Sequence, residues 1–298
     1  MYEKKTITPP EGQRMLLHLL GMGVLLINKI RYGIRGYREP RPFSPADADK
    51  AIDYDRSVVK NWLDAYEEYT GKNISGASVL ELGPGADLGP ACFLLDRGAD
   101  QYTTVDANRV IDQAPKKFYK QLLESLDNEG VVRPELEDTL AGQDDRIKYI
   151  VDPTFTISNL QQDSFDLVVS QAAFEHFSDV ETTIKELTGV MKSGGVLIAE
   201  IDLMTHTGAL RSRDPLNIYR YSNLLYKLLN FSGIPNRLRP TTYRAILEKN
   251  GWKDIEVIPL QVLPKEHARN TSSQLAKTFR SDENEMHVLT FLLRATKN

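Results

Sequence analysis

The 298-residue chain, with 41% hydrophobic and 26% charged residues, has the composition of a soluble globular protein, and its length fits one domain with insertions or a cap. Its single cysteine, Cys92, excludes a disulfide framework and indicates a reducing compartment, so we expect a cytoplasmic location. No cysteine or histidine cluster has the ligand spacing of a structural zinc site.

The net charge of −4 is unevenly distributed along the chain. Residues 14–41 contain six Lys or Arg and one acid, and residues 211–249 contain eight and two. Two basic segments on an acidic chain suggest contact with an anionic partner, although solvated helix faces give the same pattern. Nucleic acid is disfavoured as a partner, because the pI near 5.8 gives no broad basic surface.

The first apolar segment is "MLLHLLGMGVLLINKI", residues 15–30. It is shorter than the roughly 20 apolar residues of a spanning helix, and His18, Asn28 and Lys29 interrupt it. A signal peptide fits poorly, because the leader has mixed charge and no cleavage pattern follows. Two interpretations remain: a helix packed on the domain, or an interfacial anchor whose basic flank meets anionic lipid, giving peripheral membrane contact through residues 15–38.

The next elements follow a Pro-rich stretch at residues 38–45. Apolar residues at three- and four-residue steps predict a helix that Gly71 ends, so residues 1–72 are expected to form an N-terminal helical segment. A helix is predicted from Pro90 to Gly98, another at 114–126 before a charged loop at 127–145, and a third from Ser178, with Glu181 in a capping box, to Gly194. Short apolar runs predict strands at 77–82, 101–106, 146–152, 165–170, 195–201, 252–260 and 286–295.

This alternation predicts an α/β fold with a Rossmann-like, mostly parallel sheet and helices on both faces. Residues 73–298 are expected to form this domain. Residues 203–250 break the alternation and are interpreted as a helical cap inserted over the substrate.

Polar residues mark the ends of several predicted strands. The glycine loop 83–89, Asp106, Asp152 and Gln171 each follow one strand, where ligands bind in open parallel sheets. The loop alone is a weak signal, since it passes loosely for a dinucleotide motif. Glu81, two residues before the first glycine, is unfavourable beside a pyrophosphate. A cationic ligand suits it, and Asp106 can accept both hydroxyls of a ribose.

Four stretches together resemble the class I S-adenosylmethionine-dependent methyltransferases: "VLELGPGADLG", "TVDAN", "DSFDLVVSQAAFEHF" and "VMKSGGVLIAEID". The resemblance spans about residues 75–202 and implies a seven-stranded sheet, with the last strand antiparallel, and S-adenosylmethionine as cofactor. It also implies a set of cofactor-binding residues, from the methionine end through the ribose to the adenine. They are Glu81, Gly83, Pro84, Gly85 and Gln171, then Asp106, then Ala107, Asp152 and Pro153.

A second resemblance concerns the insertion, whose "NIYRYS" and "NRLRPTTY" stretches are similar to the cap of methyltransferases of bacterial surface-glycan biosynthesis. It implies that five cap residues line or shape the acceptor site: Arg220, Asn236, Arg237, Arg239 and Tyr243. Structural ion pairs are the alternative for Arg237 and Arg239. The expected acceptor is a hydroxyl of an anionic saccharide; a small natural product, a lipid, or a catalytically silent subunit are the alternatives.

Two histidines are candidates for the base that such a hydroxyl needs. His176 follows the fourth strand of the resemblance and His206 the fifth, and either also fits a structural role. Glu175, His176, Asp202 and His206 could together bind a metal, but nothing in their spacing demands it, so no metal is expected.

Overall fold

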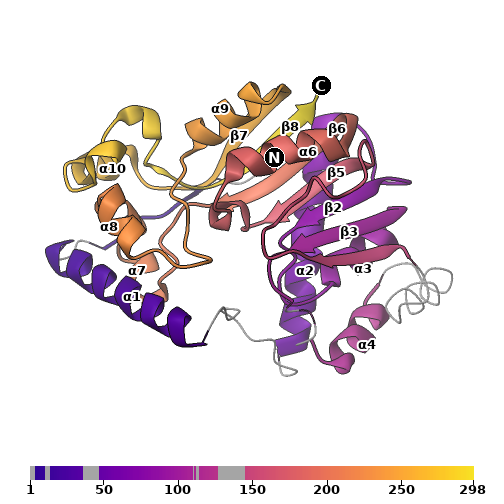
Figure 1. The fold of residues 1–298 in the computed structure, drawn as a ribbon, viewed down its shortest axis with the longest axis horizontal. Coiled ribbons are helices and arrows are strands. Elements are labelled where there is room, and N and C mark those ends of the chain that lie inside the picture. The colour runs from indigo at the N-terminus through magenta and orange to yellow at the C-terminus, as the bar shows by residue number, and fades with distance from the viewer. Residues whose placement is uncertain (1–3, 11–13, 36–46, 110, 112–113, 127–144) are drawn as a thin grey trace.

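The computed structural model describes residues 4–10, 14–35, 47–109, 111, 114–126 and 145–298 (Figure 1). The predicted Pro-rich stretch and all but the final residue of the predicted loop at 127–145 lie outside these ranges.

A single sheet organises the described residues, in the order β1-β7-β8-β6-β5-β2-β3-β4. Every neighbouring pair is parallel except those that β8 makes with β6 and β7, which confirms the mostly parallel sheet with an antiparallel last strand. The strands are β1 (Lys5–Thr6), β2 (Ser78–Leu82), β3 (Gln101–Asp106), β4 (Ile147–Val151), β5 (Phe165–Gln171), β6 (Met191–Asp202), β7 (Trp252–Val262) and β8 (Val288–Lys297). The expected count of seven is wrong, because β1 pairs with β7 and is too short to give a sequence pattern.

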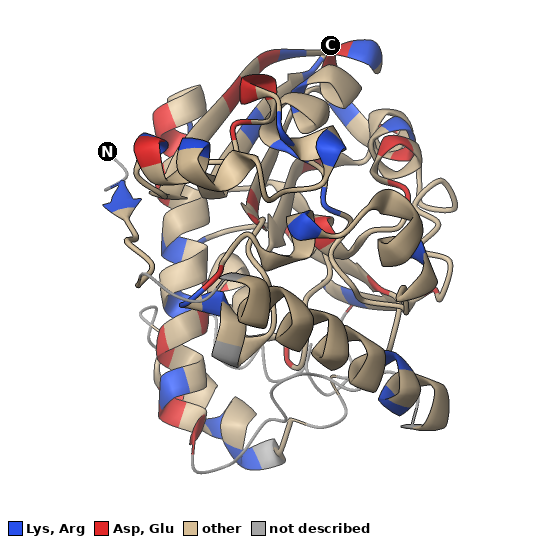
Figure 2. Cartoon of the chain, turned by 90° about the vertical axis from the view of Figure 1, so that its left-hand side faces the viewer, with Lys and Arg blue, Asp and Glu red and all other residues tan. Residues whose placement is uncertain are grey.

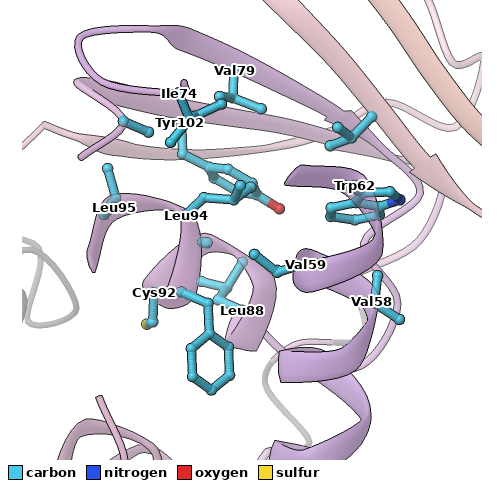
Figure 3. Packing of buried hydrophobic residues seen from close by; sticks show 14 of the residues in the cluster. Val58, Val59, Trp62, Ile74, Val79, Leu88, Cys92, Leu94, Leu95 and Tyr102 are labelled. Atoms are coloured by element: carbon cyan, nitrogen blue, oxygen red, sulfur yellow. The ribbon is translucent and has the colours of Figure 1, made fainter. Parts of the chain in front are cut away.

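Three helices cover one face of the sheet: α2 (Ala48–Thr70), α3 (Gly89–Asp96) and α4 (Lys116–Glu124). The apolar stripe of α2, which includes Val59 and Trp62, faces Tyr102 of β3 across a continuous core (Figure 3). α2 ends as predicted at Gly71, which adopts a left-handed φ of 69°.

The opposite face is covered by η3 (Phe174–His176), α6 (Val180–Val190) and α9 (Pro240–Lys249). The predicted bounds of α6 are wrong. Asp179, not Ser178, caps it by accepting a hydrogen bond from the Thr182 N–H, and the chain passes directly from Val190 into β6, well before Gly194.

A third core supports the cap, which consists of short elements. These are α7 (Gly208–Arg211), η4 (Asn217–Arg220), α8 (Asn223–Leu228), α10 (Lys265–Ser272), η5 (Lys277–Phe279) and η6 (Asp282–Asn284). Residues of the predicted insertion contribute to this core, and so do residues between β7 and β8 and Leu289 of β8. Leu25 of α1 (Arg14–Arg35) also belongs to it. The predicted domain boundaries themselves stay predictions.

α1 is longer than the apolar run that predicted it. Among the described residues, the segment Met15–Ile34 is the one helix long and apolar enough, by length and composition, to cross a bilayer, and only 11% of it is buried. The expectation that it is too short is therefore wrong, since the apolar segment continues four residues past Ile30 and gains only the charge of Arg31.

Candidate functional site

The polar residues predicted at the strand ends lie together at one edge of the sheet. Chain order reverses between β2 and β5, and ligands bind at such a reversal beyond the carboxyl ends of the strands. Alternate residues of a strand share one face, so Glu81, Asp106 and Gln171 lie on the face that α2 covers. Glu81 and Gln171 are two residues beyond core positions of their strands, and Asp106 is four residues beyond Tyr102. The site is therefore bounded by the sheet edge and α2.

The glycine loop after β2 needs glycine for two different reasons. Gly83 and Gly85 have φ values of 75° and 79°, in the left-handed region. A Cβ on Gly83 would also lie 2.7 Å from the Cβ of Ala173, so the loop abuts the segment after β5. Apart from Gly85 and its two chain neighbours, no atom of the described residues lies within 4 Å of a Cβ built on Gly85, so there is room for a ligand beside that residue.

Three buried or half-buried carboxyl groups gather behind the loop: Asp55 of α2, Glu81 of β2 and Asp87 of the loop itself. Burial raises the pKa of Glu81 to about 8, and the nearby Asp87 and Asp106 add to the rise although Tyr102 donates a hydrogen bond to this carboxyl group. Burial also raises the pKa of Asp55, which hydrogen bonds with Asp87.

One oxygen in this cluster, Oδ2 of Asp55, is buried without a hydrogen-bond partner among the described residues. Gly89 permits its close approach, because a Cβ there would collide with the Asp55 carboxyl group. Unpaired buried oxygens are unfavourable, and a cationic ligand would compensate for them. The cluster therefore fits a positively charged ligand and opposes a pyrophosphate.

Asp106 joins β3 to the glycine loop. Its carboxylate accepts hydrogen bonds from the backbone N–H groups of Gly85, Ala107 and Asn108, the last at 2.8 Å, while burial raises its pKa. Because a carboxylate has about four lone-pair sites, it can still accept from a ligand hydroxyl.

The two remaining marked strand ends lie on either side of this centre. Asp152 donates its backbone N–H to the Asp106 carbonyl at 2.9 Å. Hydrogen bonds from Thr154 to the Asp152 carboxylate lower the pKa of Asp152. The neighbouring Pro153 is exposed. Gln171 hydrogen bonds with Glu200, and both line a cavity of about 280 Å³. Trp62 of α2 also lines this cavity.

The two candidate catalytic histidines come together, with their ring centroids 4.8 Å apart. His206 Nε2 lies 3.7 Å from Oε1 of the buried Glu175 and 4.0 Å from Asp202, which pairs with Arg211 at 2.6 Å. Neither Glu175 oxygen has a hydrogen-bond partner among the described residues. The sequence alone therefore identified the members of this cluster, and the fold brings them together.

His206 has the better protonation state for a base. Its Nδ1 lies 2.9 Å from the Met204 carbonyl oxygen, which can only accept, so Nδ1 carries a hydrogen and the Nε2 lone pair is free in the neutral ring. Burial lowers the pKa of His206, but Glu175 and Asp202 together raise it above its ordinary value. Burial lowers the pKa of His176 to about 4, helped by His206, so His176 is neutral.

The same donor atoms offer a partial fit to a metal ion. One atom each from Glu175, His176 and His206 lies within 4.8 Å of the other two. Two ligand atoms of a tetrahedral zinc ion with bonds of about 2.1 Å are about 3.4 Å apart, so atoms separated by as much as 4.8 Å would have to move closer before all three bound one ion.

The three cap arginines are buried and use their guanidinium groups inside the protein. Arg220 forms a bidentate pair with Asp214 at 2.7 and 2.9 Å. Arg237 donates to the carbonyls of Ile218 and Tyr221, and Arg239, 1% exposed, donates to the carbonyls of residues 284, 285 and 288. These contacts support a role in shaping the cap, and direct contact with an acceptor stays a prediction.

The other two predicted cap residues connect the cap to the segment after β5. Asn236 donates its side-chain amide to the carbonyls of Phe174 and Phe177 at 2.9 and 3.2 Å, and its backbone N–H to the Glu175 carbonyl at 2.6 Å. Tyr243 of α9 is buried in the sheet core against Phe291. Tyr243 is therefore buried and Asn236 half-buried, and their role at an acceptor site stays a prediction.

Sequence reasoning missed Asp55 as a site residue. The signal was present, because Asp55 lies between Ile52 and Val59 on the apolar stripe of a predicted helix, where a carboxyl group needs an explanation. The sequence places Asp87 in the glycine loop, but its pairing with Asp55 of α2 depends on tertiary structure.

Residues 80–199 match the family described as "Methyltransferase domain". The match covers less than half of the chain and contains the glycine loop, Asp106 and His176. It identifies a methyltransferase domain in the chain, and with the carboxyl-lined site it supports S-adenosylmethionine as the cofactor. A search of curated proteins gives no match.

Solved structures show distant similarity. Phosphoethanolamine N-methyltransferase 2 of Haemonchus contortus, in complex with S-adenosyl-L-methionine, is 15% identical over 82% of this chain and 52% of its own, with a TM-score of 0.45. An S-adenosylmethionine-dependent methyltransferase of Mesorhizobium loti is 14% identical over 84% and 99%, at 0.44. The [4+2]-cyclase SpnF is 16% identical over 99% of both chains, at 0.44. This chain thus spans about half of the Haemonchus protein, and no residue role is transferred from these structures.

Proposed function

We propose that this protein is a cytoplasmic, S-adenosylmethionine-dependent O-methyltransferase whose acceptor is a hydroxyl of an anionic saccharide. One observation carries the cofactor assignment: Asp55, Glu81, Asp87 and Asp106 surround a glycine loop that lies within the methyltransferase-domain match. A cationic ligand such as S-adenosylmethionine favours the ionised form of these buried carboxyl groups, whereas the phosphates of a dinucleotide would oppose it.

Each part of the cofactor has residues that would hold it. Glu81, Asp87 and the unpaired oxygen of Asp55 would stabilise the positively charged methionine end, beside the open space at Gly85. Asp106 would accept from the ribose hydroxyls. Three residues flank the adenine end in this arrangement: Ala107, Asp152 and Pro153.

Catalysis on a hydroxyl then depends on proton removal and position. When bound, the cofactor supplies an electrophilic methyl group, and the protein must hold the acceptor oxygen in line with it. His206 would take the hydroxyl proton at Nε2, with Glu175 and Asp202 stabilising the imidazolium that results. Because Gly83 abuts Ala173, two residues before Glu175, the cofactor loop and this base lie side by side.

Support for a saccharide comes from the base and from the cap. An amine acceptor does not require a base, whereas a sugar hydroxyl benefits from one. The cap resemblance to glycan methyltransferases points to the same class, and the basic cap segment favours an anionic acceptor. A small natural product or a lipid is the alternative acceptor.

Calorimetric titration with S-adenosylhomocysteine, with NADH as the control ligand, tests the cofactor assignment. We expect binding of the first alone. Binding of NADH alone would overturn the interpretation of the glycine loop. A radiolabelled methyl-transfer assay on anionic and neutral saccharides then tests the acceptor class. Treatment of the products with base tests the linkage, because a methyl ether of a hydroxyl is stable to base whereas a methyl ester of a carboxylate is hydrolysed.

A further inference from the structure

α1 has a second apolar face that nothing in the described residues covers. A row of large apolar side chains along the helix is between 47% and 79% exposed. The row consists of Met15, Leu16, Leu19, Leu20, Leu26, Ile27, Ile30 and Ile34. Scattered exposed apolar residues are ordinary on soluble proteins, but a continuous row along one helix indicates a contact surface.

The other face of α1 is fixed to the cap by specific contacts. Asn217 donates to the Leu17 carbonyl and the Tyr221 hydroxyl donates to the His18 carbonyl, both at 3.0 Å. Gly21 permits this approach, because a Cβ there would collide with Asn217 and Tyr221. A spanning orientation would have to break these contacts, so α1 lies flat along the cap.

α8 extends the exposed row. Lys29 of α1 donates a hydrogen bond to the carbonyl of Leu228, the last residue of α8, so the two helices are neighbours. Leu228 and Leu224 of α8 are 62% and 72% exposed. We call the row on α1 together with Leu224 and Leu228 the docking face.

The two helices of the docking face, α1 and α8, carry charges of one sign. Neither α1 nor α8 contains an Asp or Glu, and Lys29, Arg31 and Lys227 lie on them. Figure 2 shows α1 across the face of the molecule, without acidic residues and with basic residues toward one end. Two copies of this face would bring like charges together, whereas anionic lipid headgroups would neutralise them.

We propose that the docking face binds an anionic lipid bilayer, with α1 lying in the interface rather than across it. A helix of this length covers about 30 Å of membrane surface at 1.5 Å per residue. The cap, which α1 and α8 support, then lies against the membrane. This surface is separate from the cofactor site, so it can be tested whatever the reaction is.

Vesicle flotation of the full-length protein tests the proposal. Vesicles of phosphatidylcholine alone are compared with vesicles of phosphatidylcholine and phosphatidylglycerol at 3:1, at low salt and in 0.5 M NaCl. We expect the protein to float with the anionic vesicles and salt to weaken this binding. The triple variant Leu19→Ser, Ile27→Ser and Ile30→Ser should bind at least about 100-fold more weakly, because three exposed apolar anchors are lost.

Matched variants separate the lipid contact from damage to the fold. Leu19→Met, Ile27→Met and Ile30→Met together should keep binding within about threefold, since they keep the apolar area. Arg31→Gln with Lys227→Gln should lose the preference for anionic vesicles, whereas Lys120→Gln with Lys253→Gln, exposed elsewhere, should not.

Three results would overturn the proposal. One is failure of the folded wild-type chain, checked by circular dichroism, to float with either vesicle. Another is a wild-type protein that is a dimer by light scattering and does not bind vesicles, when the triple Ser variant is a monomer. The third is retention of the protein in membranes after carbonate extraction at pH 11, which would mean that α1 spans. S-Adenosylhomocysteine affinity, measured in parallel, reports on the proposed function alone.

Discussion

Glu81 should make cofactor binding depend on pH. Its carboxyl group is buried behind the glycine loop, with a pKa near 8 in the free protein, and Tyr102, Asp55, Asp87 and Asp106 face it. The ammonium group of the ligand, which S-adenosylhomocysteine retains although it lacks the sulfonium charge, is stabilised by the carboxylate form of Glu81, so at neutral pH binding must first release this proton.

The size of the effect follows from the pKa of Glu81, which is raised to about 8. About one molecule in a hundred carries the ionised form at pH 6, about one in ten at pH 7 and about half at pH 8. If the ligand holds Glu81 ionised, affinity for S-adenosylhomocysteine should rise about tenfold from pH 6 to 7, about fivefold from pH 7 to 8, and at most about twofold above pH 8.

Calorimetry from pH 6 to 9, in two buffers of different ionisation enthalpy, measures both the affinity and the proton released. Glu81→Gln should remove most of the slope. Glu266→Gln is the control, because this exposed carboxyl group belongs to α10 in the cap, outside the carboxyl cluster. An identical slope in wild type and Glu81→Gln would refute the reasoning and assign the proton to the Asp55–Asp87 pair.

Four further outcomes are expected. Asp106→Ala should weaken S-adenosylhomocysteine binding by about 1.5–3 kcal/mol in calorimetry, because a charge-assisted hydrogen bond to the ribose is lost; near-wild-type affinity would contradict its ribose role. His206→Ala should lower kcat by a factor of about 10²–10⁴ with cofactor affinity unchanged. Glu175→Gln should move the acid limb of the pH–rate profile to lower pH, because this change removes a group that raises the pKa of His206. Dialysis against EDTA should leave methyl transfer intact, and loss of activity would make the histidine cluster a metal site. Arg239→Ala should lower the free energy of unfolding in urea by about 3 kcal/mol, since one buried and two part-buried carbonyls lose the donor of a buried side chain, whereas exposed Lys253→Ala should change it by less than about 0.5 kcal/mol.

Most of the sheet was predictable because local pattern decides it. Buried parallel strands read as short apolar runs, and glycine marks where the chain turns left-handed, as at Gly71 and Gly83. β1 was not predictable, because two residues that pair with β7 carry no periodic signal. The end of α6 was also misjudged, because pairing of Met191 with Phe165 of β5 starts the strand before any turn residue appears.

The site was predictable where residues follow strands and unpredictable where tertiary contacts decide. Asp106 and Asp152 end adjacent strands, so their meeting follows from the fold class. The pairing of Asp55 with Asp87 needed the position of α2 against the loop. Arg239 looked suited to an anionic acceptor, but a guanidinium group also suits a buried cluster of carbonyls, and sequence does not distinguish the two.

The position of β8 has a consequence for the order in which the fold can assemble. β8 follows β7 in the chain but lies between β6 and β7, and β1 is attached through β7 alone among the described strands. A growing chain that has not yet produced Val288 therefore exposes β6 as an open edge, with β7 and β1 detached from the sheet. Such an edge invites pairing with another chain, so synthesis of this protein has a vulnerable interval that ends when its central antiparallel strand is inserted.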